Sequence, residues 1–275
     1  MLKINQPIQL FKFKFFISLF IILSACTVLA QKEVDSSRIV RVLTFNIYHG
    51  ETVNADKKFD LDLLAKVIND VQPDLVALQE VDFKTERARN YDLVTELGQR
   101  TKMAPVFGKA MPYDGGEYGE GVLSKYSFLS TQNHPLKAGK DKEPRAAIEV
   151  NIKIKSGDVI RFIGTHLDHT RDATDRNNQA QQLNNLFAQD ETPTILAGDL
   201  NSRPESDAMK LLFEHWAPSD PKFEPTFPSD GPPRAKIDYV LYRPANKWRV
   251  LETKVICNDK ATDHCVLLSV LELLK

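Results

Sequence analysis

A set of polar side chains stands at the ends of predicted β-strands, scattered over much of the chain. In chain order they are Asn46, Glu80, His166, Asp199, Asn201, Asp238, Asp263 and His264. Each residue alone is more often a turn residue than a ligand. The set contains carboxylates, amides and imidazoles but no cysteine, which is the chemistry that a hard divalent cation and a phosphate group jointly require. Together these residues predict a site that binds both.

The segment Ile195–Asn201 carries the sharpest single pattern, an apolar run followed by Gly198, Asp199, Leu200 and Asn201. We expect Gly198 to let the backbone turn at the strand end, so that Asp199 and Asn201 project together beyond it. One side chain can then orient and deprotonate a water while the other donates a hydrogen bond to charge developing on phosphorus. The alternative is a strand-to-loop turn closed by side-chain hydrogen bonds.

A second pattern, Thr262-Asp263-His264, directly precedes the apolar run Val266-Leu267-Leu268. An adjacent Asp and His just before a buried strand would point toward the same rim as the other strand ends. A buried Asp–His pair is as often structural as catalytic, so this segment indicates a functional site only together with the other strand ends.

The elements that must position these residues alternate along the chain. Period-two or continuous apolar runs predict strands, and apolar residues at helical spacing predict helices, the first of them capped by Asp60. The predicted strands span 41–46, 75–78, 121–124, 146–154, 159–165, 194–197, 237–242 and 265–271, and the predicted helices span 61–68, 91–101, 176–188 and 205–213.

Consecutive strands joined by both helical and hairpin connections indicate mixed sheets, and the number of strands indicates two of them. We therefore predict an α/β fold, a four-layer α/β/β/α sandwich with two mixed β-sheets packed face to face and helices outside. Ligands of open α/β sheets bind where the strands deliver their loops, so the polar strand ends are the best site candidates.

Residues 1–30 are predicted to be a targeting segment, because Lys3, Lys12 and Lys14 precede the apolar run Phe15–Leu23 and small residues follow. Two processing sites compete: cleavage after Ala30, or a lipoprotein signal ending at Cys26, which would attach the protein to a membrane. We favour the first, since residues 28–30 continue the apolar run. An uncleaved membrane anchor is the third possibility. Residues 31–275 are predicted to form a single domain, exported to the periplasm or the outside.

Without its leader the chain holds 33 basic and 37 acidic residues, a net charge of −4. Non-specific nucleic-acid binding usually shows as a basic domain or stripe, and the sequence has neither. This balance argues against a general polyanion binder. Cys257 and Cys265 remain after processing, and export makes a disulfide between them possible. Two half-buried thiols are an equally good interpretation.

The ordered motifs carry a resemblance that covers essentially the whole mature chain. They are Leu43-Thr44-Phe45-Asn46, Leu78-Gln79-Glu80, Tyr118 to Ser124, Gly164-Thr165-His166-Leu167, Gly198 to Asn201, Ile237-Asp238-Tyr239-Val240 and Thr262-Asp263-His264. This order resembles the endonuclease/exonuclease/phosphatase superfamily of metal-dependent phosphohydrolases, whose members include pancreatic-type DNases, apurinic endonucleases, inositol polyphosphate phosphatases and neutral sphingomyelinases. That superfamily usually has Ser where Thr262 stands, and Thr keeps the hydroxyl.

The resemblance implies a role for each residue. Glu80 would be the principal ligand of Mg²⁺ or Mn²⁺, with Asn46 and Asp263 beside it. Asp199 would activate the attacking water, and Asn201 would hold the phosphoryl oxygens. His264, kept protonated by Asp238, would stabilise the pentacovalent phosphorus, and His166 would be the second imidazole on the phosphate or leaving group. Two substrate-binding candidates complete the set: Glu120, as carboxylate partner of His166, and Arg145, as a phosphate contact.

The function expected from this set is metal-assisted, in-line hydrolysis of a phosphodiester or phosphomonoester by water. The acidic balance and the predicted export favour a small or lipid-linked phosphoester as substrate. A secreted nuclease is the alternative, which a grouping of Lys125, Lys137, Lys140, Lys142 and Arg145 beside the metal would favour. A non-catalytic binding module on the same fold is a third possibility. No protein partner is indicated. His49 has no visible partner, and Asp168-His169 is expected to be a solvated loop.

Overall fold

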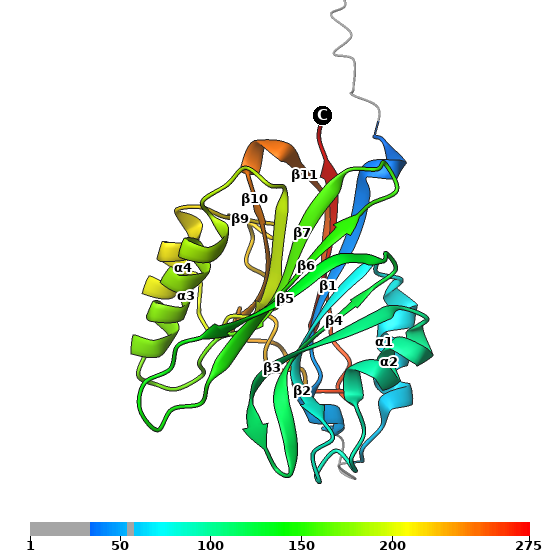
Figure 1. Ribbon diagram of the computed structural model, residues 1–275, viewed down its shortest axis with the longest axis vertical. Helices are drawn as coiled ribbons and strands as arrows, with labels where there is room; N and C mark the ends of the chain where they lie inside the picture. The colour runs from blue at the N-terminus through cyan, green and yellow to red at the C-terminus, as the bar shows by residue number, and fades with distance from the viewer. Residues whose placement is uncertain (1–33, 54–57) are drawn as a thin grey trace, which may run out of the picture. The chain divides into compact units, whose positions relative to one another are not determined.

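Two six-stranded sheets form the centre of the protein, seen in the computed structural model that describes residues 34–53 and 58–275 (Figure 1). The predicted leader and both of its processing sites lie outside the described residues. The first sheet has the order β11 (Trp248–Ile256), β12 (Val266–Leu273), β1 (Ile39–Asn46), β2 (Leu75–Phe83), β4 (Gly116–Ser124), β3 (Ala104–Tyr113). The second has the order β5 (Phe128–Leu136), β6 (Arg145–Lys153), β7 (Val159–His166), β8 (Thr194–Asp199), β10 (Asp238–Arg243), β9 (Ala217–Pro218).

Both sheets are mixed, as predicted. Strands β1 and β2 run parallel in the first sheet and β7 and β8 run parallel in the second, while the other neighbouring pairs are antiparallel. The parallel pairs need crossover connections, which helices supply. These are α1 (Leu61–Val71) between β1 and β2, and α3 (Thr174–Phe187) between β7 and β8. The remaining helices are α2 (Leu93–Thr101) and α4 (Asp207–Phe213).

Side-chain caps explain where the helices begin. Asp60 accepts a hydrogen bond from Leu63 N and starts α1, as the sequence predicts, and Asp92 starts α2 in the same way through Thr95 N. Such a cap satisfies one of the free N–H groups of the first helical turn. Short 3₁₀ turns occur at Ser36–Arg38 (η1), Tyr48–Gly50 (η2) and Ala245–Lys247 (η3).

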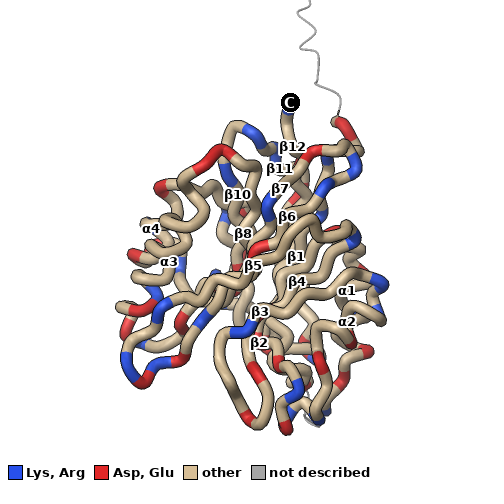
Figure 2. Tube along the Cα trace, viewed as in Figure 1, with Lys and Arg blue, Asp and Glu red and all other residues tan. Residues whose placement is uncertain are grey.

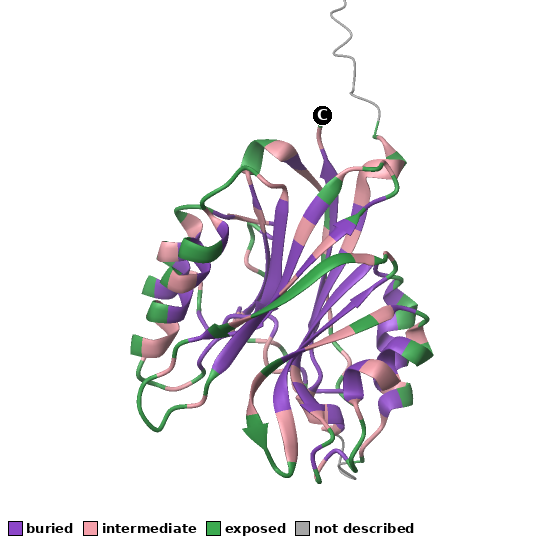
Figure 3. Cartoon of the chain, viewed as in Figure 1, coloured by how far each residue is buried: buried purple, intermediate pink, exposed green. Residues whose placement is uncertain are grey.

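Three apolar layers hold the elements together, and they establish the predicted four-layer α/β/β/α order. One layer joins α1 and α2 to the first sheet, a second lies between the two sheets, and a third joins α3 and α4 to the other face of the second sheet. Figure 3 shows the consequence: the central strands are buried along most of their length, while the helices are buried only on the side facing the sheets.

The topology brings the polar ends of the strands together at the same end of both sheets. Asn46, His166 and Asp199 are the last residues of β1, β7 and β8, and Glu80 lies near the end of β2. Asp238 begins β10, which runs antiparallel to β8, and it sits directly opposite Asp199 in the register. Asp263 and His264 immediately precede β12, whose start pairs with the end of β11. These polar residues are therefore far apart in the sequence but close together in space.

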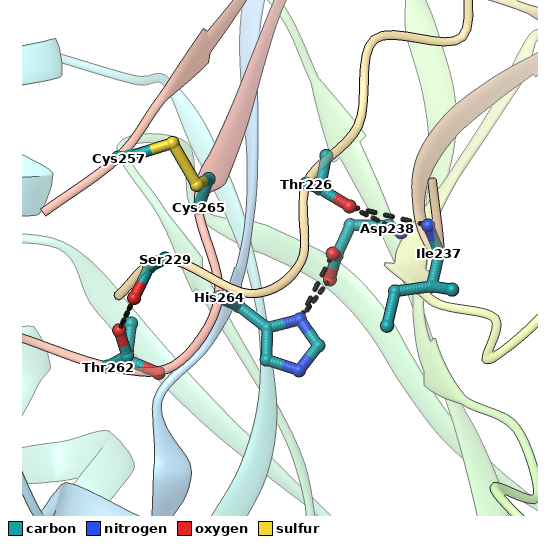
Figure 4. Close-up of a disulfide and its surroundings, with 8 residues drawn as sticks. All are labelled: Thr226, Ser229, Ile237, Asp238, Cys257, Thr262, His264 and Cys265. Atoms are coloured by element: carbon teal, nitrogen blue, oxygen red, sulfur yellow. Dashed lines mark hydrogen bonds and ion pairs between the residues drawn. A yellow bond between two sulfur atoms is a disulfide. The ribbon is translucent and has the colours of Figure 1, made fainter. Parts of the chain in front are cut away.

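Cys257 and Cys265 form a disulfide, which settles the alternative that the sequence left open (Figure 4). The bond joins the end of β11 to the start of β12 and closes the loop that carries Asp263 and His264. Within residues 34–53 and 58–275, no helix is both long enough and apolar enough to cross a membrane.

Candidate active site

A cavity of about 390 Å³ opens where these polar strand ends meet. Seven of the predicted site residues line it, namely Glu80, Arg145, His166, Asp199, Asn201, Asp263 and His264. Asn46 and Asp238 do not line it but are hydrogen-bonded to residues that do, Asn46 to Glu80 and Asp199, and Asp238 to His264. The structure thus brings together nine of the ten side chains that the sequence singled out. The exception is Glu120.

His264 is held by Asp238, as expected for an imidazole that keeps its proton. Its Nδ1 lies 3.0 Å and 3.2 Å from the two carboxylate oxygens of Asp238, and Figure 4 shows the ring turned toward that carboxylate. Burial alone would lower the pKa of His264, but the charges of Asp238 and Asp199 outweigh it and raise the pKa to about 10. At neutral pH the ring is therefore an imidazolium that can donate a proton or a hydrogen bond.

Asp199 lies between the two imidazoles. Its Oδ2 is 3.6 Å from His166 Nε2 and 3.6 Å from His264 Nε2, and its Oδ1 accepts a hydrogen bond from Asn201 N. Burial and the neighbouring charge of Asp238 raise the pKa of Asp199 to about 7. A carboxylate with such a pKa is matched to proton abstraction near neutrality, the property that a general base requires.

Both ring nitrogens of His166 have a polar neighbour within hydrogen-bond distance. Arg145 Nη1 lies 3.1 Å from Nδ1, and the side-chain amide of Asn201 lies 2.9 Å from Nε2. Nδ1 must accept from the guanidinium, which has only donors, so the ring is neutral and its single proton lies on Nε2. Burial and the positive charge of Arg145 accordingly hold the pKa of His166 well below its usual value. His166 and His264 therefore differ in charge at neutral pH, one neutral and the other cationic.

Glu80 is presented to the cavity by an irregularity in β2. The register between β2 and β4 shifts between Leu78 and Val81, and Glu80 itself has a left-handed φ of 57°. A bulge of this kind re-aims one side chain out of the strand's regular alternation. Asn46 Nδ2 lies 3.1 Å from Glu80 Oε1, and His49 Nδ1 lies 3.5 Å from Oε2. Burial would raise the pKa of Glu80, but these two neighbours help to lower it to about 2.

The residues present fit a divalent cation beside Glu80. Glu80 and Asp263 are two carboxylates facing one cavity, and burial, with the charge of Glu80, raises the pKa of Asp263. Two carboxylates repel each other, and a hard cation between them offsets this repulsion and takes their oxygens as ligands. Asn46 connects Glu80 to Asp199, since its Nδ2 lies within hydrogen-bond distance of both carboxylates, while its Oδ1 accepts from Tyr48 N. Its ligation of a metal stays a prediction.

A second group could hold a metal: Asp199, Asp238 and His264 offer ligand atoms that all lie within 4.8 Å of one another. However, Asp238 already binds His264 Nδ1, and the raised pKa of His264 keeps its ring protonated. An imidazolium has no lone pair for a metal. The placement of the cation at Glu80 and Asp263 stays a prediction, with proton chemistry as the expected role of the second group.

Glu120 requires a correction. The sequence analysis pairs it with His166, but neither of its carboxylate oxygens has a hydrogen-bond partner, and it does not line the cavity. The pleat of β4 gives Tyr118, Glu120 and Val122 the same side, and Val122 belongs to the apolar layer between the sheets. Burial there raises the pKa of Glu120 well above its usual value, so the neutral acid is favoured. The place beside His166 is taken by Arg145.

Sequence reasoning missed several residues that line the cavity. They are His49, Arg87, Met111, Tyr113, Tyr118, Glu143, His169, Phe227 and Ile237. His49 binds Glu80, and Arg87 is held by the buried carboxylate of Asp82 through two contacts of 2.6 Å and 2.8 Å. The partner of His49 comes from strand β2, so no local pattern could have revealed it, whereas Arg87 and Asp82 are only five positions apart. The expected solvated loop at Asp168-His169 is confirmed only in part, because His169 is exposed but also lines the cavity, and Asp168 is buried.

The model of the Endonuclease/Exonuclease/phosphatase family matches residues 43–264, which includes every residue of the site described above. The chain belongs to the endonuclease/exonuclease/phosphatase family. Members of this family are metal-dependent hydrolases of phosphoester bonds, and the chain is such an enzyme. The carboxylates, imidazoles and amides at the cavity are the groups this reaction needs.

Solved structures share the fold of this family member. An endonuclease/exonuclease/phosphatase from Beutenbergia cavernae is 22% identical with a TM-score of 0.72, covering 86% of this chain and 72% of that one. A mannosyl-6-phosphatase from Bacteroides thetaiotaomicron is 16% identical with a TM-score of 0.65, covering 86% of this chain and 100% of that one. D. rerio TDP2 complexed with a single-strand DNA product is 16% identical with a TM-score of 0.67, again covering 86% and 100%.

Proposed function

We propose that the protein is an exported, Mg²⁺- or Mn²⁺-dependent phosphoesterase that acts on a small or lipid-linked phosphoester. The observation that carries the choice of substrate is the charge of the cavity. No lysine is among the described residues that line it, and both of its arginines have carboxylate partners, Arg87 with Asp82 and Arg145 with Glu143. Such a cavity suits one phosphate group held by imidazoles and a metal rather than a long polyanion.

The division of labour within the site follows from the protonation states. Asp199 would take a proton from the attacking water, and the His264 imidazolium would donate to the phosphoryl oxygens as charge builds on them. Neutral His166 and Asn201 would bind the same phosphate from the other side. Glu80 and Asp263, with Asn46 beside them, would hold the cation, which would supply Lewis-acid stabilisation of that charge when bound.

The basic residues that would favour a nuclease do not gather at the cavity. Lys125 lies 3.4 Å from Asp74 and lines a separate depression, while Lys137, Lys140 and Lys142 belong to the β5–β6 connection and do not line the site. In Figure 2 the Lys and Arg positions are interspersed with Asp and Glu along the trace. These residues therefore do not form a basic groove that could follow the backbone of a single-stranded nucleic acid, which is the usual signature of proteins that bind one.

Two observations support export. The leader pattern of residues 1–30 is one, and the disulfide between Cys257 and Cys265 is the other, since disulfides persist mainly in oxidising compartments. The proposed destination is the periplasm or the outside. Lipid attachment through Cys26 would keep the enzyme at a membrane surface, where lipid-linked phosphoesters are found.

The test is a hydrolysis panel with the mature protein. Bis-p-nitrophenyl phosphate, p-nitrophenyl phosphate, sphingomyelin, phosphoinositides, single-stranded DNA and RNA are each incubated with Mg²⁺, with Mn²⁺ and with EDTA. The proposal expects metal-dependent cleavage of the small or lipid substrates at rates well above those for DNA and RNA. Preferred cleavage of a nucleic acid would overturn the substrate assignment in favour of a secreted nuclease. Mass spectrometry of the exported protein identifies Cys26 or Gln31 as its first residue.

A further inference from the structure

Arg145 binds two imidazoles at once, and only one of them belongs to the predicted set. Its Nη1 lies 3.1 Å from His166 Nδ1, and its Nη2 lies 3.0 Å from His169 Nδ1. The guanidinium is 1% exposed, and Glu143 Oε1 lies 3.0 Å from Nη1. His169 also lines the cavity and is itself exposed. The geometry therefore couples a second imidazole to the site through the same arginine.

The chemistry of arginine fixes the tautomer of His169. A guanidinium has only donors and stays protonated in proteins, so the ring nitrogen that faces Arg145 must accept. Nδ1 of His169 is that acceptor, which leaves the proton of the neutral ring on Nε2. His169 consequently carries its N–H on the nitrogen remote from Arg145, and the residue lines the cavity.

The loop that carries His169 is built to hold it. Asp168 N donates to Gln179 Oε1 at 2.8 Å, and the Asp168 carboxylate accepts from Thr170 N and Oγ1. Arg176 Nη1, from α3, donates to the backbone oxygens of Asp168 and Thr170 at 2.8 Å and 3.0 Å. Contacts on both sides of His169 thus fix its backbone against α3. A positioned donor loses less conformational entropy on binding a ligand than a mobile one.

We propose that His169 is a further substrate-binding residue, which donates its Nε2 hydrogen to a non-bridging oxygen of the phosphoester bound in the cavity. Arg145 is then a positioning residue, which aligns His166 and His169 through their Nδ1 atoms. The proposal rests on the phosphoester hydrolysis proposed above and adds a third imidazole to the two named there. Because the phosphate is anionic, each such hydrogen bond is charge-assisted and stronger than a neutral one.

Two substitutions distinguish the hydrogen bond that His169 would donate to the substrate from the hydrogen bond that it accepts from Arg145. In His169→Asn the side-chain oxygen can replace Nδ1 as acceptor for Arg145, but the Nε2 donor is lost. In His169→Gln the amide nitrogen reaches the place of Nε2, but the acceptor for Arg145 is lost. The mature protein with Mg²⁺ is assayed on p-nitrophenyl phosphate and bis-p-nitrophenyl phosphate, and its Kd for inorganic phosphate is measured by calorimetry. His215→Asn, at an exposed imidazole outside the cavity, is the matched control.

We expect His169→Asn to lower kcat/KM about 10- to 100-fold and to weaken phosphate binding by a similar factor, the usual effect of losing a hydrogen bond to a charged group. His169→Gln should recover most of that loss, and His215→Asn should match the wild type. Wild-type values for His169→Asn, or a larger loss in His169→Gln than in His169→Asn, would overturn the proposal. If the wild type binds phosphate but cleaves no ester, the proposed function fails, and the Kd values still decide the role of His169.

Discussion

The charge of Asp238 acts on the pKa of two neighbouring groups, since together with burial it raises that of Asp199 and against burial it raises that of His264, and this defines the pH range in which the site can work. Asp199 has a pKa of about 7 and His264 a pKa of about 10. Between these values Asp199 is an anion that can accept a proton, while His264 is a cation that can donate a hydrogen bond. The same carboxylate therefore prepares both the base and the acid, as expected where titratable groups are placed in distinct environments.

The first prediction concerns the pH profile. The base must be deprotonated, so kcat/KM should rise as pH increases through about 7, and the acid must be protonated, so it should fall as pH increases through about 10. Asp238→Asn removes the negative charge that raises both pKa values, so both limbs should move to lower pH. The profile is measured with bis-p-nitrophenyl phosphate at constant metal and ionic strength. An alkaline limb that does not move would show that Asp238 does not set the charge of His264.

The second prediction is the cost of removing either group. Asp199→Ala and His264→Ala should each lower kcat by about a hundredfold or more, because each removes a proton-transfer or charge-stabilising group from the transition state. Asp207→Ala, at an exposed carboxylate of α4 whose side chain is 74% accessible, is the control and should keep wild-type kcat. Circular dichroism checks that each variant is folded. Unchanged turnover in a folded Asp199 or His264 variant would refute the assignment of that residue.

Local patterns predicted those site residues that end a strand or precede one. Asn46, His166 and Asp199 follow apolar runs, and the fold needs only to align those runs for the polar ends to meet. The sequence could not show which polar groups pair across the site. His169 and Arg145 lie 24 positions apart, and their contact depends on how the loop of His169 is placed against the start of β6. The same reason explains the mistaken pairing of Glu120 with His166.

At the scale of elements, the strands that the sequence analysis missed are the edges of the sheets. Strands β3 and β11 are the edges of the first sheet, and β5 and β9 are the edges of the second. In β5, five consecutive residues are exposed, whereas β8 is buried along its whole length. Strand prediction depends on the apolar pattern that burial imposes, and an edge strand is covered less. The interior strands, which position the site, were all predicted.

Gly198 shows how an element can be predicted correctly for the wrong reason. We expected a flexible turn, but the residue belongs to β8 and its φ lies outside the left-handed region that favours glycine. A Cβ at this position would instead lie 2.0 Å from the backbone oxygen of Thr165 in β7. Glycine is needed here because the neighbouring strand approaches closely. The consequence for function is that Asp199 and His166, one position further along their strands, are brought opposite each other.

The third prediction follows from this contact. Gly198→Ala should force β7 and β8 apart, because the clash is with backbone rather than with a movable side chain. We expect a loss of about 1–3 kcal/mol in the free energy of unfolding, typical of overpacking, together with a lower kcat. Urea unfolding and turnover measure the two effects. Ala197→Gly, at the preceding position of the same strand, is the comparison: it should lose stability while affecting kcat less. Equal kcat losses would contradict a specific role for Gly198.

At the scale of the whole molecule, the site exists only where the two sheets meet. Asn46 from the first sheet donates to Asp199 of the second at 3.3 Å, and Thr262 Oγ1 donates to the backbone oxygen of Asn46. The loop of Asp263 and His264 is fixed from the other side, since Ser229 N donates to Asp263 O and Cys265 N donates to Thr226 O. Correct packing of the sheets is thus a condition for catalysis.

The fourth prediction concerns the disulfide, which closes the Asp263–His264 loop. The double variant Cys257→Ser, Cys265→Ser should lose about 2 kcal/mol of stability, because an open loop of this length has more freedom in the unfolded chain. Activity should fall only modestly, since the hydrogen bonds to residues 226 and 229 remain. Urea unfolding with and without a reductant measures the effect. A wild-type protein whose midpoint is unchanged by reductant, with free thiols verified, would contradict this prediction.

The fifth prediction links the metal to the stability of the whole fold. A cation that binds the folded state alone stabilises it, by about 2.7 kcal/mol at a hundred times its Kd, so Mg²⁺ or Mn²⁺ should raise Tm and EDTA should reverse the rise. The raised pKa of Asp263 means that its charge opposes folding at neutral pH when no cation is bound. Asp263→Asn should therefore raise Tm in EDTA and reduce the shift caused by Mg²⁺. Calorimetric scans of both proteins test this. If Mg²⁺ raises the Tm of Asp263→Asn as much as that of the wild type, the cation is not bound by Glu80 and Asp263. The group of Asp199, Asp238 and His264 would then be the better metal site.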